Sequence, residues 1–349
     1  MGDHVGSLIG QSGRATGAVR RVQSISRREA IGAVSWAALA VGIVAVLLRQ
    51  TVSLEPVVFA PICGLAVVAV FVLARRWPDW GILVAYVVAM ALFIQLRDAA
   101  DETGLRTLTG YVLDWELWMF AGVTPSAWLQ ARIGGASSDP GLPAYFSAFI
   151  HWTWFVFPHA AVLGAWLFVR KMAWRVTLIV ALTFYLGVLL YFTVPTAPPW
   201  MASDQGLVEG IARGMNAVGP AILGVDLYNW AFATMAEPNP IAAMPSLHFA
   251  ASFVVVGVGI VLRSRWVVAV ALLYSAALTF SLVYLGEHYI ADILAGGVVA
   301  FIAFSAVEGA RYVRAQLMLR RAQLSASGQR MAQWLREALR LPPSRIEAG

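Results

Sequence analysis

The sequence predicts an all-α protein, a polytopic bundle of transmembrane helices with about eight spans. Hydrophobic residues make up 60% of the 349-residue chain and charged residues only 13%, a composition that excludes a soluble globular domain. Apolar runs of about 17–25 residues recur along the chain, and each is long enough to cross roughly 30 Å of hydrocarbon as a helix. The runs lie at residues 30–48, 56–74, 80–96, 144–169, 176–194, 246–262, 266–285 and 289–310.

The positions of the basic residues predict the orientation of these helices. The basic residues that flank the runs on one side are Arg27, Arg28, Arg75, Arg76, Arg170, Lys171, Arg175, Arg263, Arg265, Arg311 and Arg314. The positive-inside rule assigns that side to the cytoplasm. We therefore expect a multi-pass plasma-membrane protein with both termini inside and with outer loops at residues 97–143 and 195–245. The formal charge of +6 then reflects topology, and no nucleic-acid partner is expected.

The chain divides into four expected regions. They are a disordered cytoplasmic arm at 1–29, N-terminal transmembrane helices at 30–96, a central membrane domain at 97–310 and a cytoplasmic tail at 311–349. The first apolar run is too long for a signal peptide, so it reads as an uncleaved anchor. The outer loops are rich in Trp and Pro, which predicts that they cap the bundle. The tail has a basic amphipathic pattern, so it either lies on the membrane surface or forms a solvated helix.

Titratable side chains at the ends of apolar helices are the candidate functional residues, because charge inside a membrane is costly. His248 follows Pro245 and Ser246 at the start of one predicted helix. Pro245 suits the first turn of a helix, where free N–H groups and the positive end of the helix dipole favour an anion. We expect a phosphate to bind at residues 246–248.

His288 and Asp292 are four residues apart, which places them on one face of a helix. Asp292 can then accept the imidazole N–H and orient the opposite nitrogen outward as a base or nucleophile. Alone, this pair also fits a satisfied interfacial histidine. Its combination with the helix start before His248, on the same outer side, favours a catalytic site.

These segments resemble the second and third motifs of the type 2 phosphatidic acid phosphatase (PAP2) superfamily. The resemblance rests on Pro245-Ser246-Leu247-His248 and on His288-x-x-x-Asp292. It is closer to the inositolphosphotransferase branch, which includes the inositol phosphorylceramide synthases, and it covers roughly residues 110–305.

The resemblance implies a PAP2-like six-helix core preceded by the N-terminal helices. It also implies that His288 attacks phosphorus to form a phosphohistidine, that Asp292 orients it, and that His248 protonates the leaving oxygen. Ser246 would help to bind phosphate, and neither a metal nor another cofactor would be needed. A zinc site is the rival interpretation, but the sequence has no His-Glu-x-x-His and its single cysteine lies in another helix.

The sequence also departs from the family pattern. Many phosphatases of the superfamily have Gly where Leu247 stands and Ser-Arg where this chain has Ser281-Leu282, and the Lys-x6-Arg-Pro first motif is missing. Another cation must then stabilise the transition state. Arg213 is the first candidate, because its guanidinium fork matches phosphate oxygens, and Arg97, Arg106 and Arg132 follow it.

Three further residues have two interpretations each. His151 either contacts the substrate headgroup or belongs to the aromatic belt at the membrane interface. His159, next to Pro158, indicates a packing or kink feature. Glu287 either binds a headgroup hydroxyl or is simply exposed to water.

Three functions remain open, and the departures from the phosphatase pattern favour the first. It is transfer of a phosphorylated headgroup, of the inositol phosphate kind, to a lipid or glycan hydroxyl. The second is hydrolysis of a phospholipid or an isoprenoid phosphate by water. The third is lipid binding or transport without catalysis, in which the histidines only line a polar pocket. No protein partner is predicted from the sequence.

Overall fold

A computed structural model describes residues 26–49, 51–52, 54–134, 140–231, 239–323 and 329–339. These residues form helices and connections, with isolated β-bridges from Thr196 to Leu108 and to Ala242 but no strand among them. The all-α prediction is therefore confirmed. Most of the arm predicted at residues 1–29 lies outside the described residues.

Six described helices are long and apolar enough to cross a membrane, and each overlaps a predicted run. They are α1 (Arg27–Arg49), α2 (Pro56–Ala74), α3 (Gly81–Ala99, continued by the 3-10 turn η1, Ala100–Thr103), α8 (Arg170–Tyr191), α13 (Arg265–Tyr284) and α14 (Ile290–Gln323). The protein is thus a multi-pass bundle in which two of the eight expected spans take another form.

The run expected at 144–169 is a bent pair, α6 (Leu142–Thr153) and α7 (Phe157–Phe168), with 44° between the two helices. Pro158 lies in the first turn of α7, and its ring clashes with a carbonyl one turn earlier in a continuous helix. The kink predicted at Pro158 is therefore present. His159 packs as predicted, because its Nδ1 lies 2.6 Å from Tyr86 Oη and its ring stacks on Phe184.

The run expected at 246–262 is α12 (Leu247–Leu262), a helix of 16 residues. It covers about 24 Å, less than the roughly 30 Å of a hydrocarbon core. The non-helical segment before it, residues 239–246, lines the cavity described below through Asn239, Pro240, Ala242 and Ala243. Irregular backbone at membrane depth is tolerated where it lines such a cavity.

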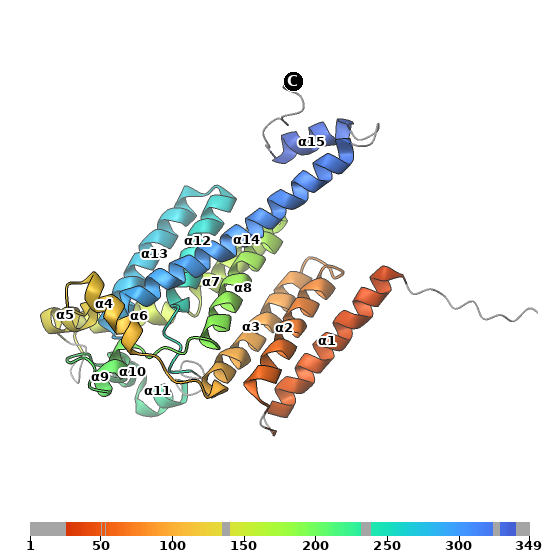
Figure 1. The fold of residues 1–349 in the computed structure, drawn as a ribbon. Coiled ribbons are helices and arrows are strands. Elements are labelled where there is room, and N and C mark those ends of the chain that lie inside the picture. The colour runs from red at the N-terminus through yellow and green to blue at the C-terminus, as the bar shows by residue number, and fades with distance from the viewer. Residues whose placement is uncertain are drawn as a thin grey trace, which may run out of the picture.

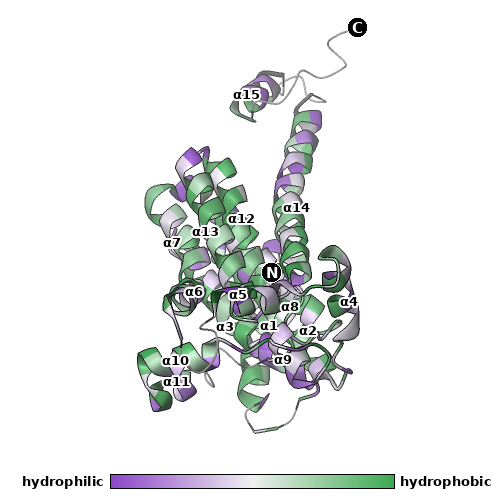
Figure 2. Ribbon diagram, turned by 90° about the vertical axis from the view of Figure 1, so that its left-hand side faces the viewer, coloured by the Kyte–Doolittle hydropathy of each residue, from purple (hydrophilic) through white to green (hydrophobic). Residues whose placement is uncertain are grey.

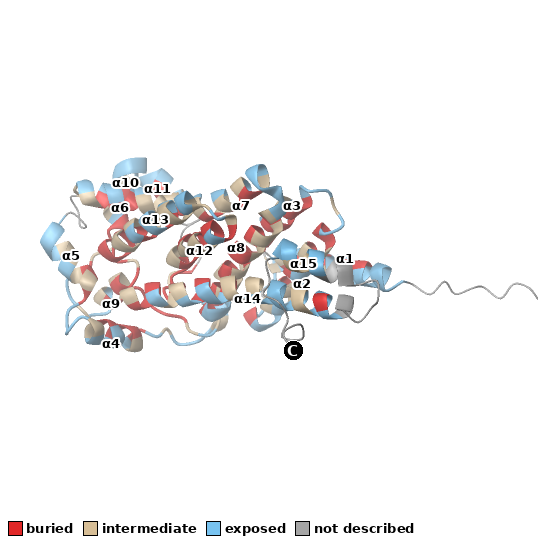
Figure 3. Cartoon of the chain, turned by 90° about the horizontal axis from the view of Figure 1, so that it is seen from above, coloured by how far each residue is buried: buried red, intermediate tan, exposed pale blue. Residues whose placement is uncertain are grey.

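The helices form two packed groups (Figure 1). The N-terminal helices α1, α2 and α3 lie beside a bundle of α7, α8, α12, α13 and α14. Helix α3 contacts this bundle through Phe93, whose ring centroid lies 5.0 Å from that of Phe184 in α8. Hydrophobic residues run along α12 and α13, and hydrophilic residues gather at the far end of α14 (Figure 2). Buried residues concentrate in α8 and α12 at the centre (Figure 3).

The basic residues flanking the helices meet at one end of the bundle. Arg76 donates to the Arg28 carbonyl, and Arg175 pairs with Glu308 of α14. Arg75, Arg175, Arg311 and Arg314 line one cleft there. The charge asymmetry in the sequence therefore corresponds to a real asymmetry of the fold.

Short helices gather at the opposite end (Figure 1). They are α4 (Gly110–Met119), α5 (Pro125–Ile133), α9 (Pro199–Asp204), α10 (Met215–Leu223) and α11 (Val225–Ala231). Gln130 of α5 hydrogen-bonds to the Ala212 and Tyr284 carbonyls, and Trp200 N donates to the Gly286 carbonyl. The two loops cap the bundle, as their composition predicts.

The C-terminal segment differs from its predicted boundaries. α14 continues past residue 310 to Gln323, and a separate helix α15 (Gln329–Leu339) follows. The basic amphipathic pattern is thus divided between the end of α14 and α15. Residues 324–328 and 340–349 of the tail lie outside the described residues.

Candidate active site

His248 stands in the first turn of α12. The Ser246 side chain caps this helix by accepting the Phe249 N–H at 3.3 Å. Pro245 was expected in the first helical turn, but it precedes the cap because Ser246 occupies that position. The Ser246 N–H also donates to the Asp292 carbonyl at 2.9 Å, which ties the start of α12 to the start of α14. Ser246 is fully buried and lies outside the cavity lining, so its hydroxyl serves the helix cap.

Leu247 occupies the position where many phosphatases of the resembled family have glycine. Its side chain is buried against Gly187 of α8, where an added Cβ would collide with the leucine methyl groups. Leu247 therefore fits on α12 because Gly187 of α8 has no side chain.

His288 lies just before α14 rather than within it, so the expected shared helical face is replaced by another geometry. Asp292, in the first turn, reaches back and its Oδ2 accepts the Tyr289 N–H at 3.0 Å, as the acidic residue of a capping box does. The same oxygen lies 3.4 Å from His288 Nδ1. His288 is 4% exposed and Asp292 is fully buried. The predicted His–Asp pair is therefore present.

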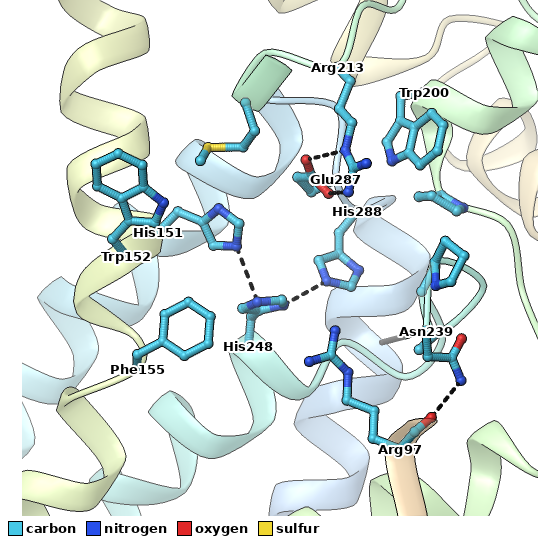
Figure 4. A pocket seen from close by; sticks show the side chains of 15 residues that line it. Arg97, His151, Trp152, Phe155, Trp200, Arg213, Asn239, His248, Glu287 and His288 are labelled. Atoms are coloured by element: carbon cyan, nitrogen blue, oxygen red, sulfur yellow. Dashed lines mark hydrogen bonds and ion pairs between the residues drawn. The ribbon is translucent and has the colours of Figure 1, made fainter. Parts of the chain in front are cut away.

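Three imidazoles form a chain (Figure 4), and its last member, His288, faces the Asp292 carboxylate. His248 Nδ1 lies 3.0 Å from His288 Nε2, and His248 Nε2 lies 3.1 Å from His151 Nε2. His151 comes from α6, and Trp154 of the α6–α7 bend packs on the His248 ring at 4.4 Å between centroids. The structure thus brings His151, His248, His288 and Asp292 together from three parts of the chain.

These contacts determine which nitrogen of each neutral imidazole carries the hydrogen. His288 Nδ1 faces a carboxylate, so it carries the hydrogen and Nε2 is an acceptor. The 3.0 Å contact then requires a hydrogen on His248 Nδ1, which leaves His248 Nε2 as an acceptor for the His151 Nε2 hydrogen. His151 Nδ1 is buried without a hydrogen-bond partner among the described residues.

Two arginines line the same cavity from opposite sides of His288 (Figure 4). Arg213 pairs with Glu287 through Nε at 3.0 Å and Nη2 at 3.4 Å, and its guanidinium covers the Trp200 ring at 4.3 Å. Arg97 comes from the end of α3, where its carbonyl accepts the Asn239 side-chain amide. Arg213, the first candidate from the sequence, and Arg97 thus both line the cavity that contains His288.

The other candidate cations lie elsewhere. Arg106 and Arg132 are exposed and do not line the cavity, and Arg132 packs over Trp128. Arg175 is at the opposite end of the bundle, paired with Glu308, as its predicted side of the membrane requires. The cavity also has apolar walls, which include Trp152, Phe155 and Met215.

Glu116 of α4 is a component that the sequence did not reveal. It is fully buried, and its carboxylate accepts the Ile290 and Ala291 N–H groups at 3.2 and 3.3 Å, at the start of α14. Burial, and to a smaller extent the neighbouring Asp292, raises the pKa of Glu116 to about 7, against the lowering effect of these two hydrogen bonds. Glu116 therefore holds the helix start that positions His288.

Glu116→Gln is expected to change the pH dependence of stability. The pKa of Glu116 in the folded protein lies above the model-peptide value of 4.5, so the folded state binds more protons between those values. Stability should fall as pH rises from about 4.5 to 7, by on the order of 3 kcal/mol. Thermal unfolding of the purified protein across this range should show a flatter profile for the variant.

Glu209→Gln is the matched control, because Glu209 is an exposed carboxylate outside the helices. It should keep the wild-type slope. Parallel profiles for the wild type and Glu116→Gln would contradict the buried titrating carboxylate.

Within the described residues, no group of three or more His, Cys, Asp or Glu side chains is arranged to hold a metal ion. The histidines instead contact one another and Asp292. The chemistry that the side chains can supply is that of nucleophile, acid and orienting carboxylate.

Comparisons with known proteins match the segment of the chain that contains these residues. A family model described as the PAP2 superfamily matches residues 111–306, more than half of the chain. The phosphoinositol dihydroceramide synthase of Bacteroides thetaiotaomicron is 31% identical over 132 residues, which are 36% of this chain and 43% of that protein. The inositol phosphorylceramide synthase of Candida albicans is 30% identical over 129 residues, 34% of this chain and 26% of that protein. The matched segments span less than half of either relative, and no solved structure matches the chain.

Proposed function

Because the chain belongs to the PAP2 superfamily, we propose that it is a membrane phosphotransferase that moves a phosphorylated headgroup from a donor lipid to an acceptor hydroxyl. The headgroup is of the inositol phosphate kind, and the acceptor is a lipid or glycan hydroxyl. The contact between His248 Nδ1 and His288 Nε2, with Asp292 behind His288, is the observation that carries the proposal. The names of the two relatives support the substrate class.

The first step transfers the headgroup to the enzyme. His288 Nε2 attacks phosphorus, the bond from phosphorus to the lipid oxygen breaks, and His248 gives a proton to that oxygen. The products are a diacylglycerol-like alcohol and a phosphohistidine that still carries the headgroup. Asp292 stabilises the positive charge that develops on the His288 ring.

The second step reverses these roles. The acceptor hydroxyl attacks phosphorus, His248 removes the hydroxyl proton, and the bond from phosphorus to His288 Nε2 breaks. His248 thereby regains the proton that it gave in the first step, and both histidines return to their starting states.

To act as an acid, His248 must carry one proton more than it holds when all three histidines are neutral. A neutral His248 that gave up its Nδ1 hydrogen would become an anion, so the active form carries hydrogens on both nitrogens. His151 then accepts the His248 Nε2 hydrogen across the 3.1 Å contact. In this role His151 orients His248 as Asp292 orients His288, which differs from the headgroup contact expected from the sequence.

The two arginines provide the charge that the missing family arginine would supply. Arg97 and Arg213 lie on either side of His288, where guanidinium groups can bind the equatorial oxygens of the transition state. An incoming phosphate would share the Arg213 fork with Glu287. Glu287 would then face the headgroup, whose hydroxyls can donate to it.

Transfer rather than hydrolysis requires that water be kept from the phosphohistidine. The apolar cavity walls and the capping loops support this exclusion. By the positive-inside rule, the basic end of the bundle lies in the cytoplasm, so the site opens on the outer face of the plasma membrane.

Purified protein with phosphatidylinositol labelled in its phosphate tests this function. We expect a labelled lipid product in the presence of a lipid extract or ceramide, and release of diacylglycerol. Labelled phosphatidate runs in parallel as the substrate of a phosphatase. If the protein released inorganic phosphate from phosphatidate and left phosphatidylinositol unchanged, hydrolysis would be its function instead of transfer. If it turned over neither lipid, lipid binding without catalysis would be favoured.

A further inference from the structure

A second cavity lies at the end of the bundle opposite the histidines. It has a volume of about 760 Å³ and opens between α2, α8 and α14. Its walls are mostly apolar, with Val68 and Phe71 from α2, Leu182 from α8 and Val307 from α14. The three helices are candidate membrane spans, so this cleft faces hydrocarbon rather than water. Acyl chains are the material that fills an apolar cleft at this depth.

The mouth of the cleft is strongly basic. Arg75, Arg311 and Arg314 line it and are exposed, and none forms an ion pair with a carboxylate of the described chain. The remaining pair at the mouth, Arg175 with Glu308, is internally neutral. Three guanidinium groups without a carboxylate partner among the described residues therefore stand at the mouth of the cleft.

We propose that this cleft binds an anionic phospholipid, with its phosphate between Arg75, Arg311 and Arg314 and its acyl chains between the three helices. Guanidinium forks match phosphate oxygens, and basic clefts between spans select acidic headgroups. The lipid would connect the N-terminal helices, through α2, to α8 and α14 of the catalytic bundle. This binding is independent of the reaction at His288.

The chain's own tail is a poorer occupant on grounds of charge. α15 is polar on average and carries Arg336, so placing it among the three arginines would add like charge. A phosphodiester instead cancels part of the positive charge and supplies the apolar chains that the walls require.

The experiment compares two lipids with matched acyl chains, phosphatidylglycerol and phosphatidylcholine, added to the full-length protein in a neutral detergent. Phosphatidylglycerol should raise Tm by about 5 °C and remain bound in native mass spectrometry, whereas phosphatidylcholine should do neither. The double variant Arg311→Gln/Arg314→Gln should lose both effects. Arg265→Gln is the control, because Arg265 is exposed at the same end but outside the cleft.

A second variant tests the cleft without changing charge. A Cβ at Gly64 meets nothing within 4 Å, and Gly64 lines the cleft, so Gly64→Phe is expected to place its ring there. It should weaken retention of phosphatidylglycerol at least about tenfold while the arginines remain. Equal retention of the two lipids by the wild type, or undiminished retention in both variants, would overturn the proposal.

Discussion

Replacing His288 by alanine is expected to lower the rate of phosphotransfer by at least about 10⁴-fold, because the variant lacks the proposed nucleophile. In this variant Asp292 has no imidazole beside it to orient. With phosphatidylinositol labelled in its phosphate, the wild type should form an acid-labile protein adduct, and His288→Ala should form none. Rapid quenching followed by gel separation measures both quantities.

His159→Gln is the control for this experiment. His159 is also a partly buried histidine, but it bonds to Tyr86 on α3 and does not line the catalytic cavity. It should retain the labelled adduct. A labelled adduct of normal amount in His288→Ala would assign the nucleophile to another residue.

Replacing His248 by alanine should produce the second largest loss, about 10²–10⁴-fold, because an alkoxide is a poor leaving group without a proton donor. A donor whose leaving group is p-nitrophenolate needs no proton. For that donor we expect the loss in kcat to shrink to about tenfold or less. A loss that is equal for both donors would contradict the acid role.

His151→Ala separates the orienting role from headgroup contact. Around His248 the titratable or charged groups are His151 from α6, His288 before α14 and Arg97 from α3; Arg213 and Glu287 lie near His151. Loss of the His151 acceptor should leave the Nε2 hydrogen of protonated His248 without a partner, so kcat should fall while KM stays close to the wild-type value. A rise in KM with an unchanged kcat would instead assign His151 to headgroup contact.

Much of the fold follows from the lengths of the apolar runs, because a helix must satisfy its own backbone across hydrocarbon. The exceptions have local causes. Pro158 divides one run into α6 and α7, and the cap at Ser246 shortens α12. α14 extends past its predicted end, because its charged continuation is still a good helix former once it leaves the membrane.

The site is predictable where its parts are close in sequence. Pro245 to His248 and His288 to Asp292 carry their own signals, and the structure joins them. Residues such as Arg97 and Glu116 come from distant segments, and only the packing of α3 and α4 against the end of the bundle brings them in. A single buried acid in a Trp-rich loop carries no pattern that identifies it.

The contact between Leu247 and Gly187 has an evolutionary consequence. Because the leucine fills space that a side chain at position 187 would need, position 187 can gain a side chain only when position 247 becomes smaller. A relative with glycine at position 247 would have room for a larger residue at position 187. We therefore expect this pair to covary between branches of the superfamily, although neither residue lines the catalytic cavity.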